Sequence, residues 1–122
     1  MPYILEFSAL YDIRHSFSRL VMPSDEHFII DKDATEVNGW TKEEFLKAIM
    51  GKELSFKEVW IQFLKWLDSI GLDNLENIYL CAYNGYKFDF RVLIHELRRF
   101  RIYSVPKFKL IDPWIDWVVL KK

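Results

Sequence analysis

The strongest constraint on this chain is a long amphipathic pattern in its middle. A set of large apolar residues recurs there at three- and four-residue spacing: Phe56, Val59, Trp60, Phe63, Leu64, Leu67 and Ile70. Ser55 and Glu58 precede it in the spacing of a capping box, and Gly71 follows where a left-handed cap would end a helix. The pattern predicts one amphipathic helix over about residues 56 to 70 that packs against the core.

The residues before this helix favour a hairpin and a further helix. The segments "YILEFSALYD" and "SFSRLVMP" are rich in strand-forming residues and flank the polar "DIRH", and the second segment ends at Pro23. The segment "SDEHFIIDKDATEVNG" lacks sustained periodicity and is typical of a surface loop. Thr41 and Glu44 form a second capping box, which predicts that a helix begins there.

The residues after the long helix alternate between strand and helix patterns. The apolar "NIYLCAY" predicts a buried strand, "FDFRVLIHELRRF" a helix, "KFKLID" another strand, and "PWIDWVVLKK" a last helix with Pro113 at its first position. The expected order is therefore a hairpin, two helices, a strand, a helix, a strand and a helix. This alternation indicates an α/β fold.

Composition places these elements in one intracellular domain. A chain of 122 residues with 51% hydrophobic and 29% charged residues has the size of a single domain, 1–122. Its one cysteine, Cys81, lies in an apolar run, which predicts a buried free thiol in a reducing compartment. With neither a signal-peptide pattern nor an apolar run of about 20 residues, we expect no membrane association and a location in the cytoplasm or nucleus.

Charge is distributed unevenly along the chain. Residues 1–86 hold 8 basic and 14 acidic side chains, a net charge of −6, whereas residues 87–122 hold 9 and 4, a net charge of +5. The basic part includes Arg98, Arg99 and Arg101 at the end of a predicted helix. Such a cluster indicates either an anion-binding surface or a solvated helix end whose cations complement the helix dipole.

The segment "AYNGYKFDFRVLIHEL" resembles the second motif of the DEDDh, or DnaQ-like, 3′-to-5′ exonucleases, in which a strand ends in Ala-His-Asn and a Phe-Asp pair precedes a helix. The resemblance rests on Ala82, Asn84, Phe88, Asp89 and Leu93. In order, "ILEFSAL", "FSRLVMP", "ATEVNGWTKEEF" and "KLIDPW" are similar to further segments of that family. The resemblance implies an RNase H-like mixed sheet flanked by helices.

In that family, four carboxylates hold two Mg²⁺ or Mn²⁺ ions that activate water and stabilise the leaving oxygen. The strand with Asp-x-Glu and the late His-x-x-x-x-Asp motif have no counterpart here, and Tyr83 replaces the histidine of the second motif. Asp89 alone remains as a catalytic and metal-binding candidate, and one carboxylate holds such ions weakly. We therefore expect a catalytically inactive relative that needs no cofactor on its own, acting in nucleic-acid binding or protein interaction. The alternative is a Mg²⁺- or Mn²⁺-dependent exonuclease whose missing carboxylates come from a partner chain or from the rest of a longer protein.

Several residues are candidates for contact with single-stranded DNA or RNA. They are Tyr83, Asn84, Trp40, Arg98, Arg99 and Arg101. Each has a structural alternative: Asn84-Gly85 is a turn signal, Trp40 suits a hydrophobic contact at a helix start, and Asp89 suits a helix N-cap. Both readings stay open at this point.

The resemblance also implies a gap in the sheet. The family's first strand would lie between "ILEFSAL" and "NIYLCAY", so its loss leaves two strand edges with unpaired backbone groups. The two strands could pair directly, a second copy or another protein could supply a strand, or the chain could be a piece of a longer protein. A homodimer or a protein partner at the vacant edge is therefore expected beside nucleic acid.

Overall fold

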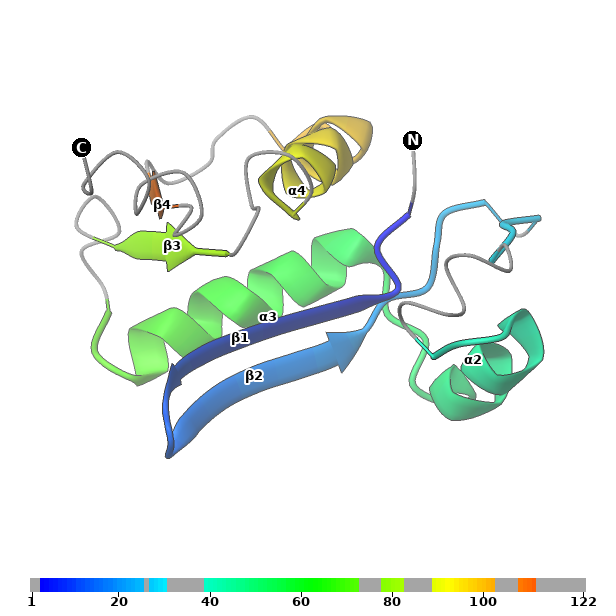
Figure 1. Cartoon of the computed structure of the whole chain (residues 1–122), viewed down its shortest axis with the longest axis horizontal. Helices are drawn as coiled ribbons and strands as arrows, with labels where there is room; N and C mark the ends of the chain where they lie inside the picture. Colours follow the sequence, from blue (N-terminus) through cyan, green and yellow to red (C-terminus); the bar gives the residue numbers. More distant parts are fainter. Residues whose placement is uncertain are drawn as a thin grey trace, which may run out of the picture. The chain divides into compact units, whose positions relative to one another are not determined.

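The structure, a computed structural model, describes residues 3–25, 27–30, 39–72, 78–82, 89–102 and 108–111. Its elements run in the order β1 (Glu6–Asp12), β2 (His15–Leu20), α2 (Lys42–Ile49), α3 (Phe56–Ser69), β3 (Tyr79–Cys81), α4 (Asp89–Arg99) and β4 (Lys109–Ile111) (Figure 1). The chain divides into a unit formed by Tyr3–Trp60 and a unit formed chiefly by the residues from Ile61 onward. The single domain expected over residues 1–122 stays a prediction.

β1 and β2 form the antiparallel hairpin that the sequence predicts. Their register pairs Ala9 with Phe17 and Asp12 with His15. The Asp12 carboxylate accepts hydrogen bonds from the backbone N–H groups of Arg14 and His15, both at 2.8 Å, which closes the turn. These bonds, that of Arg14 above all, lower the pKa of Asp12. The polar "DIRH" segment thus makes a tight turn because its aspartate satisfies the turn's own backbone donors.

α2 covers a small core of buried apolar residues, Phe28, Phe45 and Ile49. Thr41 caps the helix, since its Oγ1 accepts a hydrogen bond from the Glu44 N–H at 3.2 Å. Lys42 adds a tie between the helix and the preceding loop: its Nζ donates to the Phe28 carbonyl oxygen at 2.7 Å and lies 4.5 Å from the Phe28 ring centre. The predicted capping box therefore begins a helix here.

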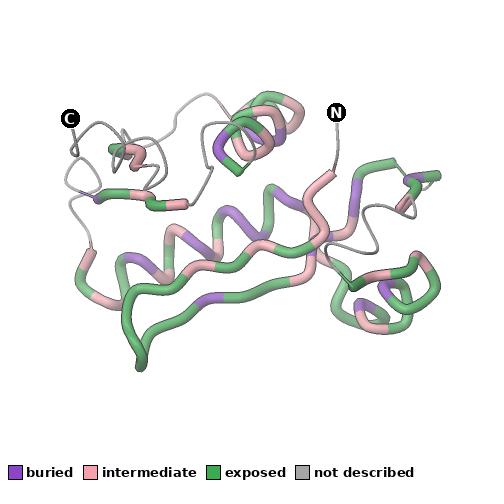
Figure 2. The backbone as a smooth tube through the Cα atoms, viewed as in Figure 1, coloured by how far each residue is buried: buried purple, intermediate pink, exposed green. Residues whose placement is uncertain are grey.

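α3 is the amphipathic helix that the sequence predicts over about residues 56 to 70. Ser55 and Glu58 form a reciprocal capping box, with bonds of 3.2 and 3.3 Å between each side chain and the other's backbone N–H. Figure 2 shows buried residues recurring along one side of the helix: Phe56, Val59, Trp60, Phe63 and Leu67. At the other end, Gly71 has φ 86, and the N–H of Leu72 donates to the Leu67 carbonyl at 2.9 Å. This is the left-handed cap that the glycine predicted.

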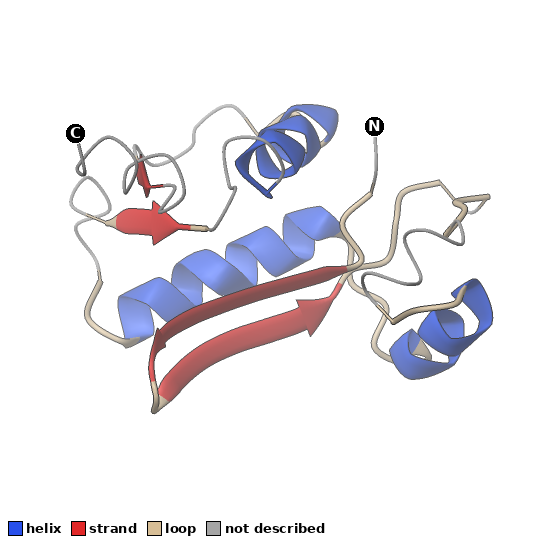
Figure 3. Ribbon diagram, in the orientation of Figure 1, coloured by secondary structure: helices blue, strands red, loops and turns tan. Residues whose placement is uncertain are grey.

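β3, α4 and β4 form a strand-helix-strand unit with parallel strands (Figure 3). The expectation that Cys81 is buried is wrong, because the thiol is exposed. β3 pairs with β4 in a two-stranded sheet, and residues two apart on a strand lie on the same face. Tyr79 and Cys81 share an exposed face, while Leu80 is half-buried on the other. A continuous apolar run predicts a strand that is buried on both faces, whereas one face of this pair is open.

The described part of the chain is thus a small mixed α/β fold with three helices and two two-stranded sheets. Among these residues, β1 pairs with β2 and β3 pairs with β4, and the direct pairing of β1 with β3 stays a prediction. The RNase H-like arrangement stays a prediction. The last helix expected over residues 113–122 and much of the loop over residues 24–39 lie outside the described residues. No helix in the described ranges is long and apolar enough to cross a membrane.

Candidate functional site

α4 carries most of the basic side chains that the sequence singled out. Its apolar side buries Phe90 and Leu97, which lie seven residues apart and therefore on one face. Asp89 stands in the first turn and Arg98 and Arg99 in the last, so that both ends complement the helix dipole. The amphipathic sequence thus fixes which side chains of the helix face solvent.

Arg101 ends α4 in a conformation that favours glycine. The N–H of Arg101 donates to the Arg98 carbonyl at 3.0 Å, and that of Ile102 donates to the Leu97 carbonyl at 2.8 Å, which is the hydrogen-bond pattern of a Schellman cap. Arg101 therefore takes φ 56, and a side chain in this left-handed region costs about 1 kcal/mol relative to glycine. A charged residue stands at a position where the backbone alone would favour glycine.

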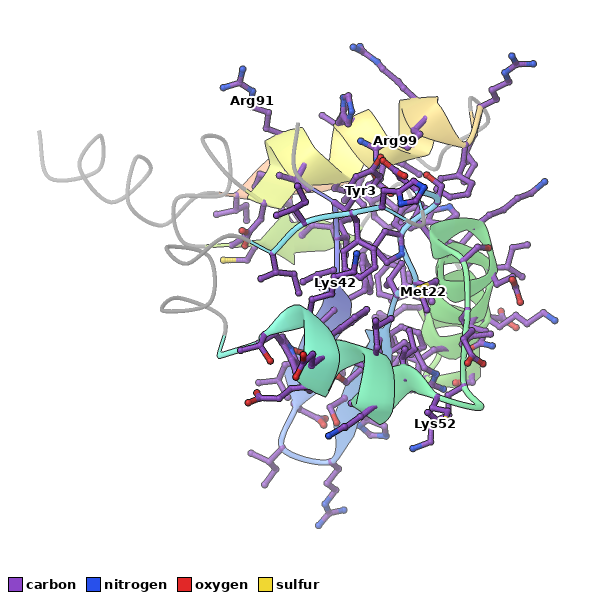
Figure 4. All side chains as sticks on the ribbon, turned by 90° about the vertical axis from the view of Figure 1, so that its right-hand side faces the viewer. Tyr3, Met22, Lys42, Lys52, Arg91 and Arg99 are labelled. Atoms are coloured by element: carbon purple, nitrogen blue, oxygen red, sulfur yellow. The ribbon has the colours of Figure 1, made fainter. Side chains whose placement is uncertain are left out.

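Three exposed guanidinium groups form what we call the basic strip: Arg91, Arg98 and Arg101. Arg91 and Arg98 are seven residues apart on α4 and share one face, and Arg101 follows at the cap. Figure 4 shows the Arg91 side chain projecting away from the α4 ribbon. Within the described ranges, no acidic side chain forms an ion pair with any of the three. The strip is an exposed, cationic surface.

His95 lies between Arg91 and Arg98 in the sequence of this helix. Partial burial lowers the pKa of His95, and the positive charges of Arg99 and Arg98 lower it further. Protonation of His95 is thus disfavoured while the neighbouring arginines keep their charge uncompensated. An anion bound at the strip would reverse this effect, because a negative charge favours the protonated imidazole.

Arg99 differs from its two neighbours in the predicted arginine cluster. Its guanidinium forms an ion pair with the Glu96 carboxylate, which is buried, and the Arg99 side chain itself is only 21% exposed. Burial raises the pKa of Glu96, and the charge of Arg99 opposes that rise. Arg99 therefore compensates a buried acid, whereas Arg98 and Arg101 extend into solvent.

Asp89, the candidate metal ligand, is exposed at the first residue of α4. Its carboxylate stands at the positive end of the helix dipole, a position that favours an acid without any metal. In the ranges that the structure describes, no group of three or more histidine, cysteine, aspartate or glutamate side chains is arranged to hold a metal ion. Tyr83 and Asn84, the other candidates in this turn, lie outside the described residues.

Trp40 packs at the start of α2. Its ring meets that of Phe45 edge to face, with centres 5.9 Å apart, and the indole is half-buried beside the Phe28 core. With Thr41 as the N-cap, Trp40 and Phe45 occupy the two positions of a hydrophobic staple. The structural alternative for Trp40 is confirmed, and its contact with a nucleic-acid base stays a prediction.

Two residues of interest were not among the sequence-based candidates. Arg91 stands outside the arginine cluster at the helix end, and the signal for it is its seven-residue spacing to Arg98, which places both on one helix face. Tyr79 was missed because an aromatic residue in an apolar run was assigned to the core, and no local signal shows which face of a short strand stays open.

Comparison with known proteins found no relative, since no protein-family model, no curated protein and no solved structure matches this chain. The similarity to DEDDh exonucleases therefore rests on sequence motifs alone and remains a hypothesis.

Proposed function

We propose that this chain binds single-stranded nucleic acid through the basic strip and does not cleave it by itself. The observation that carries the proposal is the exposure of Arg91, Arg98 and Arg101 without an acidic partner in the described part of the chain. Arginine presents five donors in a planar fork that suits phosphate oxygens. The left-handed backbone of Arg101 adds support, because costly backbone conformations of this kind cluster at functional sites.

The charge distribution supports the same partner. The strip lies in the part of the chain with a net charge of +5, and a polyanion is the ligand that such a region attracts. If all three arginines contact phosphates of a single strand, the slope of log affinity against log salt is about −2. Affinity would then fall about 20-fold between 50 and 200 mM salt.

The absence of cleavage follows from the ligand count that the sequence predicts. Asp89 is the one family carboxylate with a counterpart here, and a lone exposed carboxylate binds Mg²⁺ weakly because the ion gives up its waters reluctantly. Removing preorganised charge typically slows catalysis about 100-fold or more for each group lost. The proposed protein is thus a DEDDh-like domain that retains binding and has lost independent catalysis.

The binding part is tested by fluorescence anisotropy with labelled 15-nucleotide oligo-dT and oligo-U at several salt concentrations. One variant replaces Arg91, Arg98 and Arg101 with glutamine. Its matched control replaces three exposed lysines of the other unit with glutamine: Lys47, Lys52 and Lys57. Both variants lose the same charge. We expect the arginine variant to lose at least tenfold in affinity and most of the salt dependence, and the lysine variant to stay within about twofold. Equal losses in both variants, or no binding by the original protein, would refute the proposal.

Cleavage is tested on the same oligonucleotides with Mn²⁺ and with Mg²⁺. We expect full-length oligonucleotide after prolonged incubation. If the protein shortened them from the 3′ end and Asp89→Asn abolished the activity, the alternative of a metal-dependent exonuclease would hold instead.

One observation favours a protein partner as a second candidate. Near its turn, the β1–β2 hairpin exposes Leu10 (75%) and Ile13 (99%). In the described part of the chain, β1 pairs with β2 alone, so its other edge has no strand partner there. Such an edge can accept a strand from a second copy or another protein. Light scattering after size-exclusion chromatography tests the homodimer: a dimer that Leu10→Lys dissociates supports it, and a monomer at all concentrations excludes it.

A further inference from the structure

The open face of the β3–β4 pair carries an aromatic ring and a cation side by side. In the parallel register, Tyr79 is paired with Lys109 and Cys81 with Ile111, so these side chains share one face. Tyr79, Cys81 and Lys109 are exposed, and Figure 2 shows exposed residues alternating with a half-buried one along β3. This face belongs to the same unit as α4 and is distinct from the basic strip.

Tyr79 is held in place without being covered. Tyr79 is 56% exposed, which is high for an aromatic residue in a strand. Lys109 Nζ lies 3.4 Å from the Tyr79 hydroxyl oxygen and 5.1 Å from the ring centre. The ammonium group is thus nearer to the hydroxyl end than to the middle of the ring. Lys109 therefore orients the ring through its hydroxyl group and through a cation–π contact, while part of the ring surface stays open to solvent.

Such a pair has the chemistry of a subsite for an unpaired nucleotide. An exposed ring on a strand offers a stacking surface for a base, and every base has a face that can stack on it. An ammonium group beside the ring can contact the phosphate of the same or the next nucleotide. In a duplex, the bases stack on each other and offer no free face to a side chain.

We propose that Tyr79 and Lys109 form a base-stacking subsite for single-stranded nucleic acid, with the base on the Tyr79 ring and a phosphate at Lys109. The inference rests on the proposed function and deepens it, because it adds a reason for preferring single strands to duplexes. Charge complementarity favours this occupant: in the described part of the unit from Ile61 onward, Asp68 and Asp89 are the only exposed acids, against five exposed cations, Lys65, Arg91, Arg98, Arg101 and Lys109.

The first test compares binding of oligo-dT with binding of a 15-base-pair duplex by anisotropy. We expect Tyr79→Ala to weaken oligo-dT binding about tenfold, Tyr79→Phe to leave it within about twofold, and both to leave duplex binding unchanged. Tyr11→Ala is the matched control, because Tyr11 is an exposed tyrosine on the hairpin of the other unit. Circular dichroism establishes that each variant is folded.

The outcomes separate the two proposals. If the original protein does not bind, or the arginine variant binds as well as the original, the proposed function fails. If binding depends on the arginines and Tyr79→Ala and Tyr11→Ala bind equally well, the subsite fails while the proposed function stands.

The second test leaves both residues of the proposed subsite, Tyr79 and Lys109, unchanged. Cys81 is the one cysteine of the chain, is exposed, and lies two residues from Tyr79 on the same face. A benzophenone maleimide attached to Cys81 should crosslink to oligo-dT on irradiation. The control protein carries Cys81→Ser and Ser16→Cys, which moves the label to the exposed β2 strand. Crosslinking at both positions alike, or at neither while anisotropy shows binding, would overturn the subsite.

Discussion

Arg101 occupies at the end of α4 the cap position that Gly71 occupies at the end of α3. In both caps the residue donates its N–H to the carbonyl three residues earlier, both bonds are 3.0 Å long, and the next residue donates to the carbonyl five earlier. Gly71 reaches φ 86 without a side chain, whereas Arg101 reaches φ 56 with one. The same backbone motif is thus built once with the residue that suits it and once with a cation.

This relationship predicts a trade-off at residue 101. Arg101→Gly and Arg101→Ala remove the same charge, but only glycine relieves the left-handed strain, so the glycine variant should be about 1 kcal/mol more stable than the alanine variant. Urea unfolding measures the difference. Both variants should bind oligo-dT more weakly than the original protein and to the same extent. Equal stability of the two variants would show that this backbone position is not strained.

Arg98 and Arg99 should differ sharply in what they contribute to stability. Arg99→Ala leaves the buried Glu96 carboxylate without its countercharge, which should destabilise the fold by about 2 kcal/mol, whereas the exposed Arg98→Ala should cost less than about 0.5 kcal/mol. Urea unfolding of both variants at pH 7 tests this, and similar losses would contradict it.

The Arg99→Ala variant also has a predicted pH dependence. Burial raises the pKa of Glu96 in the folded protein, and loss of Arg99 should raise it further. A raised folded pKa stabilises the fold below the unfolded pKa, and this contribution is lost as pH rises through the folded pKa. The destabilisation by Arg99→Ala should therefore be smaller near pH 4 than at pH 7. A penalty independent of pH would argue against a buried, charged Glu96.

His95 should report an anion bound at the basic strip. Its pKa is lowered in the free protein, so the neutral imidazole stabilises the fold above the unfolded pKa, and this contribution is lost as pH falls through the folded pKa. Phosphates beside Arg91 and Arg98 should raise the His95 pKa, so binding takes up a proton and oligo-dT affinity increases as pH falls through the His95 pKa of the complex.

An NMR titration of the His95 imidazole with and without oligo-dT measures this directly, with His95→Asn to assign the signal. The same variant should show a weaker pH dependence of affinity. An unchanged His95 pKa in the complex would place the nucleic acid elsewhere.

Trp40 should matter for stability and not for binding. Trp40→Ala removes the staple partner of Phe45 and exposes part of the Phe28 core, which should cost about 2 kcal/mol because the indole is half-buried. Trp40→Phe should recover most of this loss. Oligo-dT affinity, measured where each variant is folded, should not change. A loss of affinity without a loss of stability would instead support base contact by Trp40.

The local structure of this protein can be predicted from residue type and spacing alone. Capping boxes at Thr41 and Ser55, the glycine cap at Gly71 and the turn at Asp12 depend on hydrogen bonds between neighbours in the chain, so residue type and spacing suffice to predict them. The order of β3, α4 and β4 was predictable from apolar patterns, which are likewise local.

Which side of each element faces solvent depends on tertiary packing. Tyr79 and Cys81 lie in an apolar run that predicts burial, yet both are exposed because they share the open face of the β3–β4 pair. Glu96 and Arg99 stand at the local i,i+3 spacing of a helical ion pair, but only the fold shows that Glu96 is buried, which is why Arg99 acts as its countercharge while Arg98 faces solvent. Burial depends on contacts between residues far apart in the chain, which local spacing does not encode. Of the proposed nucleic-acid surface, Arg98 and Arg101 were therefore candidates from the sequence, whereas the open face that carries Tyr79 emerged only from the fold.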